Sequence, residues 1–463
     1  MKNDLQPAVI SLYEIRQTIH PRAVRGWFAA WRWTLVWATQ IVFYGGAWLE
    51  WNGRQAVLLD IANRKFFIFG LVFWPQDVIY LTVLLIISAL SLFLFTAVAG
   101  RLWCGYACPQ TVYTEIFMWV ERMIEGDRNA RMRLDAQKAD ARKILLKAAK
   151  HGAWMAIALW TGFTFVGYFT PIRELFHDTY SLRIGAWESF WALFYGFATY
   201  GNAGWMREQV CKYMCPYARF QSAMFDKDTM VITYDSARGE PRGSGKKSIP
   251  ENSRLGDCVD CGICVQVCPT GIDIRDGLQY ECIGCAACID GCDQVMDKVG
   301  SPRGLIRYAT THALEKGWSR AQMFRRVLRP RVLVYFSILA LIVLAAGASL
   351  ALRVPLKVDV IRDRAAMARE VEEGLVENLY RLQIMNTTEQ ARAFVIEVTG
   401  LPGMHVAGEP ITGVPAASSR MVPVKVRALS YGVAPGSHPI EFHVRALGAG
   451  GAEVSEDSVF ILR

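Results

Sequence analysis

The sequence predicts a multidomain membrane protein that combines five transmembrane α-helices, a soluble cysteine-rich domain and a C-terminal immunoglobulin-like β-sandwich. Three observations predict this fold class. Apolar stretches raise the hydrophobic fraction of the 463 residues to 52%, although 20% of the residues are charged. Eight of the 12 cysteines lie within residues 258–292. Residues 353–463 contain no cysteine, and they alternate apolar with polar side chains.

The N-terminal segment, residues 1–30, is polar and mixed in charge. It lacks the apolar core and the small-residue cleavage site of a signal peptide, so we expect it to be retained and to lie in the cytoplasm. Arg16, Arg22 and Arg25 precede the first apolar stretch, as basic residues on the cytoplasmic flank of a span usually do.

Five apolar stretches are close to the roughly 20 residues that a helix needs to cross a bilayer. Residues 31–205 are predicted to hold four of them, and residues 331–352 form the fifth. The first four are residues 31–51, 78–100, 152–169 and 186–205.

Two further stretches near these spans have other predicted roles. Residues 66–74 are apolar but too few to span, so we expect them to lie at the outer interface or to re-enter the membrane. Residues 121–150 have the charge pattern of one amphipathic helix.

Basic residues predict the orientation of the chain. The loop 101–150 holds ten Lys/Arg and the segment 206–330 holds 18, whereas 52–77 and 171–186 hold three and two. Basic segments stay in the cytoplasm, so the C-terminal domain is expected outside and all cysteines inside or at the membrane edge. Cytoplasmic thiols stay reduced, which argues against disulfides. The net charge of +9 comes from these flanks, so we expect a lipid bilayer and no nucleic acid as a partner.

Residues 258–292, within a predicted cytoplasmic domain over 206–330, contain two cysteine runs of the form C-x2-C-x2-C-x3-C, 24 positions apart. Cluster iron prefers thiolate sulfur, and four cysteines hold one [4Fe–4S] cluster. In bacterial-type two-cluster ferredoxins the fourth cysteine of each run ligates the other cluster. This rule assigns Cys258, Cys261, Cys264 and Cys292 to cluster 1, and Cys268, Cys282, Cys285 and Cys288 to cluster 2.

A pair of structural zinc sites is the alternative interpretation of these runs. Zinc motifs usually show two separated C-x2-C pairs rather than a triplet with a remote fourth cysteine. The runs differ in one respect, because Asp293 follows the second where Pro269 follows the first. We expect this difference to change the local backbone rather than the ligation.

The other four cysteines form two C-x3-C-P pairs, each shortly after a predicted span. They are Cys104 and Cys108 before Pro109, and Cys211 and Cys215 before Pro216. Each proline is suited to the first position of a helix. Both pairs are expected at the cytoplasmic membrane edge, where thiolates together with Met206 or Met214 would suit Cu(I). A third cluster, a zinc site, a dithiol/disulfide couple and inert packing cysteines also fit the spacing.

The C-terminal residues read as short half-buried strands separated by turns that contain Gly and Pro. The expected strands are residues 379–384, 393–398, 422–426 and 440–444. A domain of about 100 residues built in this way has the size of an immunoglobulin-like sandwich.

Several motifs outside the two runs follow one another in a specific order. They are Cys104-Gly-Tyr-Ala-Cys108-Pro109-Gln110-Thr111, Cys211-Lys-Tyr-Met-Cys215-Pro216-Tyr217-Ala218-Arg219-Phe220-Gln221, Met224-Phe225-Asp226, Tyr234-Asp235 and Arg238-Gly-Glu-Pro-Arg242-Gly243. With these motifs the chain resembles the CcoG/FixG/RdxA family, membrane-bound dicluster ferredoxin proteins accessory to cytochrome cbb3 oxidase. The resemblance runs from about residue 11 through the last span, and the tail is similar to the family's immunoglobulin-like domain.

The resemblance implies a multi-pass bacterial inner-membrane protein with a periplasmic C-terminal domain. It implies a cupric reductase that converts Cu(II) to Cu(I) for assembly of a cbb3-type oxidase. Copper would then be a substrate or transient ligand of Cys104, Cys108, Cys211 and Cys215. The eight cysteines of 258–292 would hold two [4Fe–4S] clusters. Expected partners are the oxidase assembly machinery, copper donors or acceptors, and an unidentified cytoplasmic electron donor.

Two other functions compete with copper reduction. One is a quinol-linked electron relay, for which the sequence identifies no quinone pocket. The other is a non-catalytic scaffold for oxidase assembly, whose outer domain would hold a partner. Cluster reduction by a quinol analogue would favour the relay, and loss of function on deleting residues 356–463 would favour the scaffold.

Overall fold

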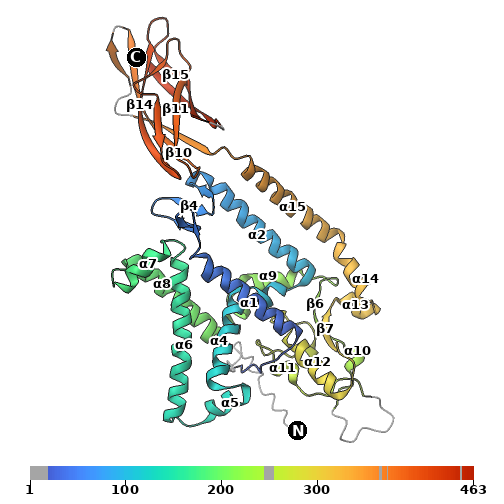
Figure 1. The fold of residues 1–463 in the computed structure, drawn as a ribbon. Coiled ribbons are helices and arrows are strands. Elements are labelled where there is room, and N and C mark those ends of the chain that lie inside the picture. Colours follow the sequence, from blue (N-terminus) through green and yellow to red (C-terminus); the bar gives the residue numbers. More distant parts are fainter. Residues whose placement is uncertain (1–18, 244–254, 364–367, 373, 449–450, 463) are drawn as a thin grey trace, which may run out of the picture. The chain divides into compact units, whose positions relative to one another are not determined.

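A computed structural model of the chain describes residues 19–243, 255–363, 368–372, 374–448 and 451–462. Residues 1–18 of the predicted N-terminal segment therefore lie outside the described residues. The chain forms two compact units, each assembled from separate segments (Figure 1). The first unit comprises Met1–Tyr44, Ser88–Phe165 and Gly185–Leu339, and the second comprises Gly45–Ile87, Val166–Ile184 and Ala340–Arg463.

Long helices lie at every predicted span. They are α1 (Trp27–Gly46), α2 (Val78–Ala99), α6 (Ala141–Val166), α8 (Ala186–Thr199) and α15 (Pro330–Ala351). Within the described residues, two helical stretches are long and apolar enough to cross a membrane, Pro75–Ala99 and Pro330–Ala351. The first of these joins η1 (Pro75–Asp77) to α2. α8 is 14 residues long and continues as the π-helical η2 (Tyr200–Met206). The three other spans stay predictions.

The prediction of one helix over residues 121–150 is wrong. The chain instead forms α4 (Pro109–Glu125), α5 (Arg128–Ala136) and the start of α6. Gly126 ends α4 with a φ of 88°, a conformation that favours glycine. The reason for the fold-back is charge pairing, because buried Glu125 accepts ion pairs from Lys147 and Lys150 of α6, each at 3.0 Å. An exposed amphipathic helix would leave these groups in solvent.

The remaining helices of the first unit are short and surround the cysteine runs. They are α3 (Leu102–Tyr106), η3 (Val210–Met214), α9 (Pro216–Met224), α10 (Ser236–Gly239), α11 (Ile263–Gln266), η4 (Ile274–Asp276), α12 (Ala287–Val299), α13 (Thr311–Lys316), α14 (Arg320–Arg325) and η5 (Arg326–Leu328). Antiparallel strands β6 (Val231–Tyr234) and β7 (Ile306–Ala309) complete the cysteine-rich domain. Ile232, Ile289, Met296 and Ile306 share a buried core with Cys258 and Cys292.

Residues 66–74 fall within a small sheet, and their expected place at a membrane interface stays a prediction. β3 (Val57–Asp60), β4 (Lys65–Ile68) and β5 (Leu71–Phe73) make a three-stranded antiparallel sheet in the second unit. The sheet forms because Phe67 and Val72 point to one face and pack around buried Met385. β1 (Glu50–Trp51), β2 (Arg54–Gln55) and α7 (Ile172–Tyr180) also belong to this unit.

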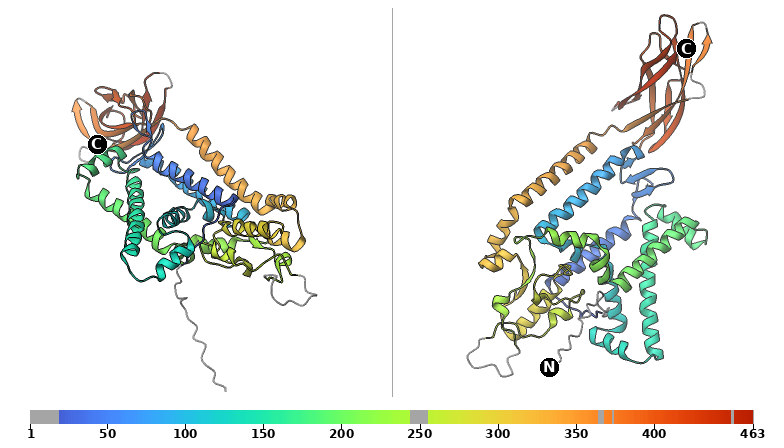
Figure 2. Two further views of the ribbon diagram at one scale, coloured as in Figure 1. Left: turned by 60° about the horizontal axis from the view of Figure 1, so that its bottom comes forward. Right: turned by 180° about the vertical axis from the view of Figure 1, so that it is seen from behind.

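The C-terminal residues form the predicted two-sheet sandwich, coloured orange to red (Figure 1, Figure 2). One sheet has the order β12-β14-β10-β8, with β9 on β10, and the other has the order β13-β11-β15-β16. All four predicted strands occur, within β10 (Leu375–Asn386), β11 (Arg392–Thr399), β14 (Ser418–Leu429) and β15 (Gly436–Ala446). The prediction did not name β8 (Leu356–Arg362), β9 (Arg369–Glu372), β12 (His405–Ala407), β13 (Ile411–Val414) and β16 (Glu453–Leu462).

The sandwich core needs no cysteine because alternate residues of both sheets point inward. Ile440, Phe442 and Val444 of β15 are buried at every second position. Tyr380 of β10 meets Phe442 edge to face, with ring centroids 5.0 Å apart. The buried Tyr380 hydroxyl donates to the carbonyl of Val459 at 2.9 Å, so its polar atom is satisfied.

Candidate iron–sulfur and thiol site

The 24-residue repeat of the two cysteine runs is also a repeat of backbone conformation. Gly262 and Ala286 are equivalent positions, and both have left-handed φ values, of 64° and 59°. Asp260 and Gly284 are also equivalent, with φ values of 51° and 71°. Alternating left-handed residues turn successive N–H groups toward one side, which suits an anionic iron–sulfur cluster. Gly262 and Ala286 also cap α11 and α12, so each run folds into the same loop-to-helix turn.

The eight cysteines line two adjoining cavities, each with about 330 Å³ of empty space. One cavity is lined by Cys258, Cys261, Cys264 and Cys292, the predicted cluster 1 set. The other is lined by Cys268, Cys282, Cys285 and Cys288, the predicted cluster 2 set, with Cys264 at its border. The other lining residues are largely apolar, which is the surrounding that iron–sulfur clusters favour. Four thiols around one cavity fit the donor set of a [4Fe–4S] cluster.

The first C-x3-C-P pair packs directly against the second cysteine run. A Cβ atom added to Gly105 would lie 2.8 Å from the backbone of Gly284 and Cys285, so only glycine fits there. Arg101, just before this pair, donates hydrogen bonds to the carbonyls of Tyr280 and Cys282. The turn that carries Cys104 is therefore in backbone contact with the cluster 2 loop.

Each proline of the C-x3-C-P pairs occupies the first turn of a helix, as predicted. Pro109 opens α4 after the cap residue Cys108, and Pro216 opens α9 after the cap residue Cys215. The pairs do not lie on one face of a continuous α-helix, since Cys104 is in α3 and Cys211 is in the π-helical η3. Each pair instead bridges the end of one helix and the start of the next.

The two pairs approach each other around the second run. Cys104 and Cys211 both pack on an apolar cluster formed by Val267, Ile283, Cys285 and Ala287. Cys104 Sγ lies 3.4 Å from the side-chain oxygen of Gln221, and Arg101 Nε donates to the same oxygen at 2.9 Å. Gln221 is fully buried in α9, the helix that follows Cys215. This glutamine therefore links the first pair to the helix of the second.

Burial raises the pKa of three of these thiols, Cys104, Cys108 and Cys211. Desolvation raises the pKa of Cys104 to about 11 and that of Cys211 to about 12. Electrostatic repulsion from the neighbouring Cys108, Cys104 and Cys215 adds to the rise in the pKa of Cys211. Within the described ranges, no three Cys, His, Asp or Glu side chains are arranged around a single metal ion. A metal at these thiols would therefore displace protons and draw the side chains together.

The N-terminus of α1 is attached to the cysteine-rich domain. Asp290 of α12 accepts hydrogen bonds from the N–H groups of Phe28 and Ala29, at 3.2 and 2.7 Å. A carboxylate at this end of a helix also compensates the positive end of the helix dipole. Arg32, one turn further along α1, donates to the carbonyl of Cys285 at 2.6 Å.

Sequence analysis did not find Arg32, Arg101, Gly105 and Gln221 as parts of this site. Arg101 and Gln221 lie beside or within the two C-x3-C-P motifs, and this proximity could have identified them as parts of the site. Arg32 offered a different signal, since a charged residue inside an apolar stretch usually has a function. The contact of Gly105 with Cys285 depends on tertiary packing, which no local pattern encodes.

Family comparisons match three regions of the chain. Residues 206–311 match a model described as a 4Fe-4S dicluster domain, and residues 81–125 match one described as a 4Fe-4S binding domain. Residues 346–463 match the model of the IG-like fold at the C-terminus of FixG. Two [4Fe–4S] clusters are thus the cofactor of the cysteine-rich domain, and the second model covers Cys104 and Cys108.

Similar proteins cover most of the chain. The nitrogen fixation protein FixG of Rhizobium meliloti is 41% identical over 434 residues, which are 86% of this chain and 82% of that protein. Protein RdxA of Cereibacter sphaeroides is 40% identical over 460 residues, 96% of both chains. A crystal structure of a FixG-related protein from Vibrio parahaemolyticus covers 24% of this chain and 97% of its own, at 24% identity and a TM-score of 0.21.

Proposed function

The chain belongs to the family of FixG, RdxA and RdxB, and from this premise we propose that it is a membrane-bound cupric reductase. Its substrate is Cu(II), its product is Cu(I), and the product serves the assembly of a cbb3-type cytochrome oxidase. The observation that carries this proposal is the direct packing of the C-x3-C-P turns on the second cysteine run. It rests on the Gly105–Cys285 backbone contact and on the apolar cluster shared by Cys104, Cys211 and Cys285.

The cysteine-rich domain supplies the electrons in this proposal. Cluster 1 is held by Cys258, Cys261, Cys264 and Cys292, and cluster 2 by Cys268, Cys282, Cys285 and Cys288. When bound, each [4Fe–4S] cluster takes up and releases one electron. Cys264 borders both cavities, so the two sites adjoin and cluster 2 is the one next to the C-x3-C-P thiols.

The four thiols of the C-x3-C-P pairs receive the copper. Cys104, Cys108, Cys211 and Cys215 are soft donors, and soft thiolates bind Cu(I) more favourably than Cu(II). Their preference raises the driving force for the uptake of one electron by each Cu(II). Arg101 and Gln221 position Cys104, because both contact its turn. Neither side chain has a thiolate that could bind copper. The protons released by the thiols on binding leave to solvent.

The location of the protein is part of the proposal. The Lys/Arg counts favour a bacterial inner membrane with five spans, the clusters in the cytoplasm and the sandwich in the periplasm. Copper donors or acceptors and the oxidase assembly machinery are the proposed partners. The sandwich follows the last predicted span, so it is the part of the protein that periplasmic partners would contact.

Anaerobic EPR with metal analysis tests the copper assignment. Cu(II) is added to the dithionite-reduced full-length protein and to a variant with serine at positions 104, 108, 211 and 215. We expect the wild type to lose the Cu(II) signal and to retain Cu(I) after desalting. The variant should keep the iron of both clusters, retain no copper and reduce Cu(II) far more slowly. Equal copper retention and reduction in both proteins would refute the assignment.

A third [4Fe–4S] cluster at the C-x3-C-P pairs is the second candidate. The match of residues 81–125 to a 4Fe-4S binding domain favours it, because this range includes Cys104 and Cys108. The same samples decide between the two. A third cluster requires half as much iron again in the wild type as in the serine variant, whereas a copper site requires equal iron.

A further inference from the structure

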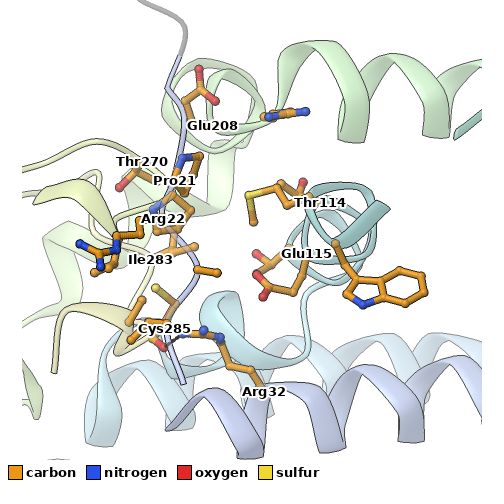
Figure 3. A pocket seen from close by; sticks show the side chains of 18 of the residues that line it. Pro21, Arg22, Arg32, Thr114, Glu115, Glu208, Thr270, Ile283 and Cys285 are labelled. Carbon is orange, nitrogen blue, oxygen red and sulfur yellow. Dashed lines mark hydrogen bonds between the residues drawn. The ribbon is translucent and has the colours of Figure 1, made fainter. Parts of the chain in front are cut away.

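A cavity lined by charged and apolar side chains, and partly open to solvent, lies in the first unit beside the second cysteine run. Arg32 of α1 and Glu115 of α4 line it, together with Cys285 and Cys211 (Figure 3). We propose that this cavity and an apolar groove next to it bind an isoprenoid quinol, which supplies the electrons. This inference rests on the proposed function for the fate of the electrons. It replaces the expected cytoplasmic donor with a lipid-soluble one.

Arg32 has a donor that the protein leaves unused. The residue is 6% exposed, and its Nη1 is occupied by the carbonyl of Cys285. Its Nε is buried and has no hydrogen-bond partner among the described residues. Buried donors are nearly always satisfied, so an unused one at the wall of a cavity points to a ligand oxygen. A quinone carbonyl is such an acceptor, and here it would lie next to a peptide of the cluster 2 loop.

Glu115 provides the complementary acceptor. Its half-buried carboxylate lines the same cavity, and Figure 3 shows it directed into the space beside Ile283 and Cys285. No described residue donates a hydrogen bond to Glu115 or forms an ion pair with it. A carboxylate within reach of a quinol hydroxyl can accept its hydrogen bond and then its proton.

The apolar groove continues the cavity between α1, α4 and α6. It is open to its surroundings and is lined by Trp33, Trp37, Ile116, Trp119 and Trp160, among others. Trp33 and Trp119 line both spaces, and their rings meet edge to face at 6.3 Å. The α1 and α6 residues belong to predicted spans, so the groove suits an isoprenoid tail. The two spaces together match a molecule with a polar head and a long apolar tail.

An anionic phospholipid also has a polar head and apolar tails, but the residues that line the cavity favour the quinol. Three acidic residues, Asp127, Glu115 and Glu208, line the same space as its five arginines. Arg131, another lining residue, is already paired with buried Glu121 at 2.7 Å. A phosphate would therefore meet carboxylates as well as guanidinium groups. The cavity lies beside Cys285, a predicted cluster ligand. A redox-active ligand bound there could pass electrons to the cluster, which a structural lipid could not do.

The reaction balances with the proposed copper chemistry. Oxidation of one quinol breaks two O–H bonds and yields one quinone, two protons and two electrons. The two electrons reduce two Cu(II) ions to two Cu(I) ions. Glu115 accepts the first proton, and the second passes to water at the mouth of the cavity. No further oxidant or reductant is needed.

Anaerobic binding of decylubiquinol to the dithionite-reduced, detergent-solubilised full-length protein tests this inference, with quenching of tryptophan fluorescence as the readout. Glu115→Gln replaces the anionic acceptor of the quinol hydroxyl with a weaker neutral one, and Ala156→Phe fills the groove that Ala156 lines. The matched controls are Glu174→Gln and Ala148→Phe, which change exposed residues that line neither space. We expect saturable quenching in the wild type and controls, and a Kd raised about tenfold or more in both test variants. An equal Kd in all five proteins would overturn the inference.

Two further arms separate this inference from its alternatives. Dihexanoylphosphatidylglycerol is added as a competitor. Displacement of decylubiquinol at comparable concentration, with no effect of Glu115→Gln on either ligand, would assign the cavity to a lipid and overturn the inference. Cu(II) is also added to dithionite-reduced Glu115→Gln protein, which should oxidise at the wild-type rate. If decylubiquinol does not bind but this oxidation persists, the quinol inference fails and the proposed function stands. If decylubiquinol binds but Cu(II) oxidises neither protein, the proposed function fails instead.

Discussion

The two cysteine runs share their spacing and their backbone turns but have very different surroundings. In the first run Cys261 is exposed, and nearby Arg275 pairs with Asp260 and Asp273 at the surface. No cysteine of the second run is exposed, and the carbonyls of its loop accept hydrogen bonds from three side chains outside the run. Those donors are Arg101 to Cys282, Tyr308 to Gly284 and Arg32 to Cys285.

This difference shows how two runs with the same sequence pattern become structurally distinct through their neighbours. The first run exposes one cysteine to solvent, whereas the second contacts the C-x3-C-P turns and the cavity lined by Arg32 and Glu115. Two equivalent clusters would be interchangeable in a small soluble ferredoxin. In the proposed function, these neighbours make the second site the one that exchanges electrons with other groups, and the first site holds the second electron.

The largest expected effect compares one ligand from each run. We expect Cys285→Ser to abolish cluster 2 and to slow Cu(II)-dependent oxidation by about 1000-fold, or about 4 kcal/mol in the barrier. Cys261→Ser should lose cluster 1 while the remaining cluster is still oxidised by Cu(II) within about tenfold of the wild-type rate. EPR of the reduced variants and anaerobic stopped-flow absorbance measure both results. The reverse ranking would show that the exposed run faces the copper.

A buried carboxylate fixes the helices on the side of the second run. Glu121 of α4 pairs with Arg207 at 2.5 Å and with Arg131 at 2.7 Å. Burial alone would raise the pKa of Glu121, but Arg207 and Arg131 outweigh burial and lower the pKa. The stabilisation is therefore present above the carboxyl's unfolded-state pKa and is lost as the pH falls through the lowered one.

Glu121→Gln should lower the free energy of unfolding by about 3 kcal/mol, because it leaves two buried guanidinium groups uncompensated. Thermal melting of the solubilised protein at neutral pH measures the change. The matched control is Glu174→Gln, an exposed position, which should melt within error of the wild type. Equal melting of the two variants would mean that the buried pairs do not hold α4.

The backbone contact between Gly105 and Cys285 can be broken with one methyl group. Gly105→Ala places a Cβ atom 2.8 Å from the Cys285 backbone, so the first C-x3-C-P turn must move away. We expect Cu(II)-dependent oxidation to slow by about tenfold, while iron content and cluster absorbance stay at wild-type levels. The control Gly152→Ala, with no neighbour within 4 Å, should leave the rate unchanged. An unaffected rate in Gly105→Ala would remove this contact from the electron path.

The smallest expected effect sharpens the comparison at the glycine turns. Gly262→Ala should cost about 1 kcal/mol, the usual penalty for a left-handed residue with a Cβ. Gly284→Ala should cost more, because its Cβ would also lie 3.0 Å from the carbonyl oxygen of Arg101. Chemical denaturation with cluster absorbance as the probe gives both values. Equal decreases in the free energy of unfolding would mean that the Arg101 backbone moves away at little cost. The second run would then be less tightly held than its contacts suggest.

Local patterns predicted the parts of this protein that depend on local chemistry. The spacing of the runs divided eight cysteines into the two sets that surround the two cavities. The prolines marked the starts of α4 and α9, because a missing N–H is harmless only in the first turn. Alternation found four strands of the sandwich, since one face of each is buried. The short strands β9, β12 and β13 carry too few alternations to be recognised.

The rest could not be read from the sequence because it depends on partners distant in the chain. Phe67 and Val72, in the apolar stretch 66–74, pack on Met385, which lies more than 300 positions away in the chain. Ala286 takes the same left-handed turn as Gly262 without being a glycine. The cavity beside Cys285 is assembled from α1, α4, η3 and the second run, so no single stretch of sequence encodes it.

Anaerobic stopped-flow mixing of dithionite-reduced protein with Cu(II) tests the central claim most directly. The wild type is compared with the variant that carries serine at positions 104, 108, 211 and 215. The account predicts rapid oxidation of both clusters in the wild type and oxidation slower by about 100-fold or more in the variant, with unchanged cluster absorbance before mixing. Oxidation of the two proteins at the same rate would contradict it.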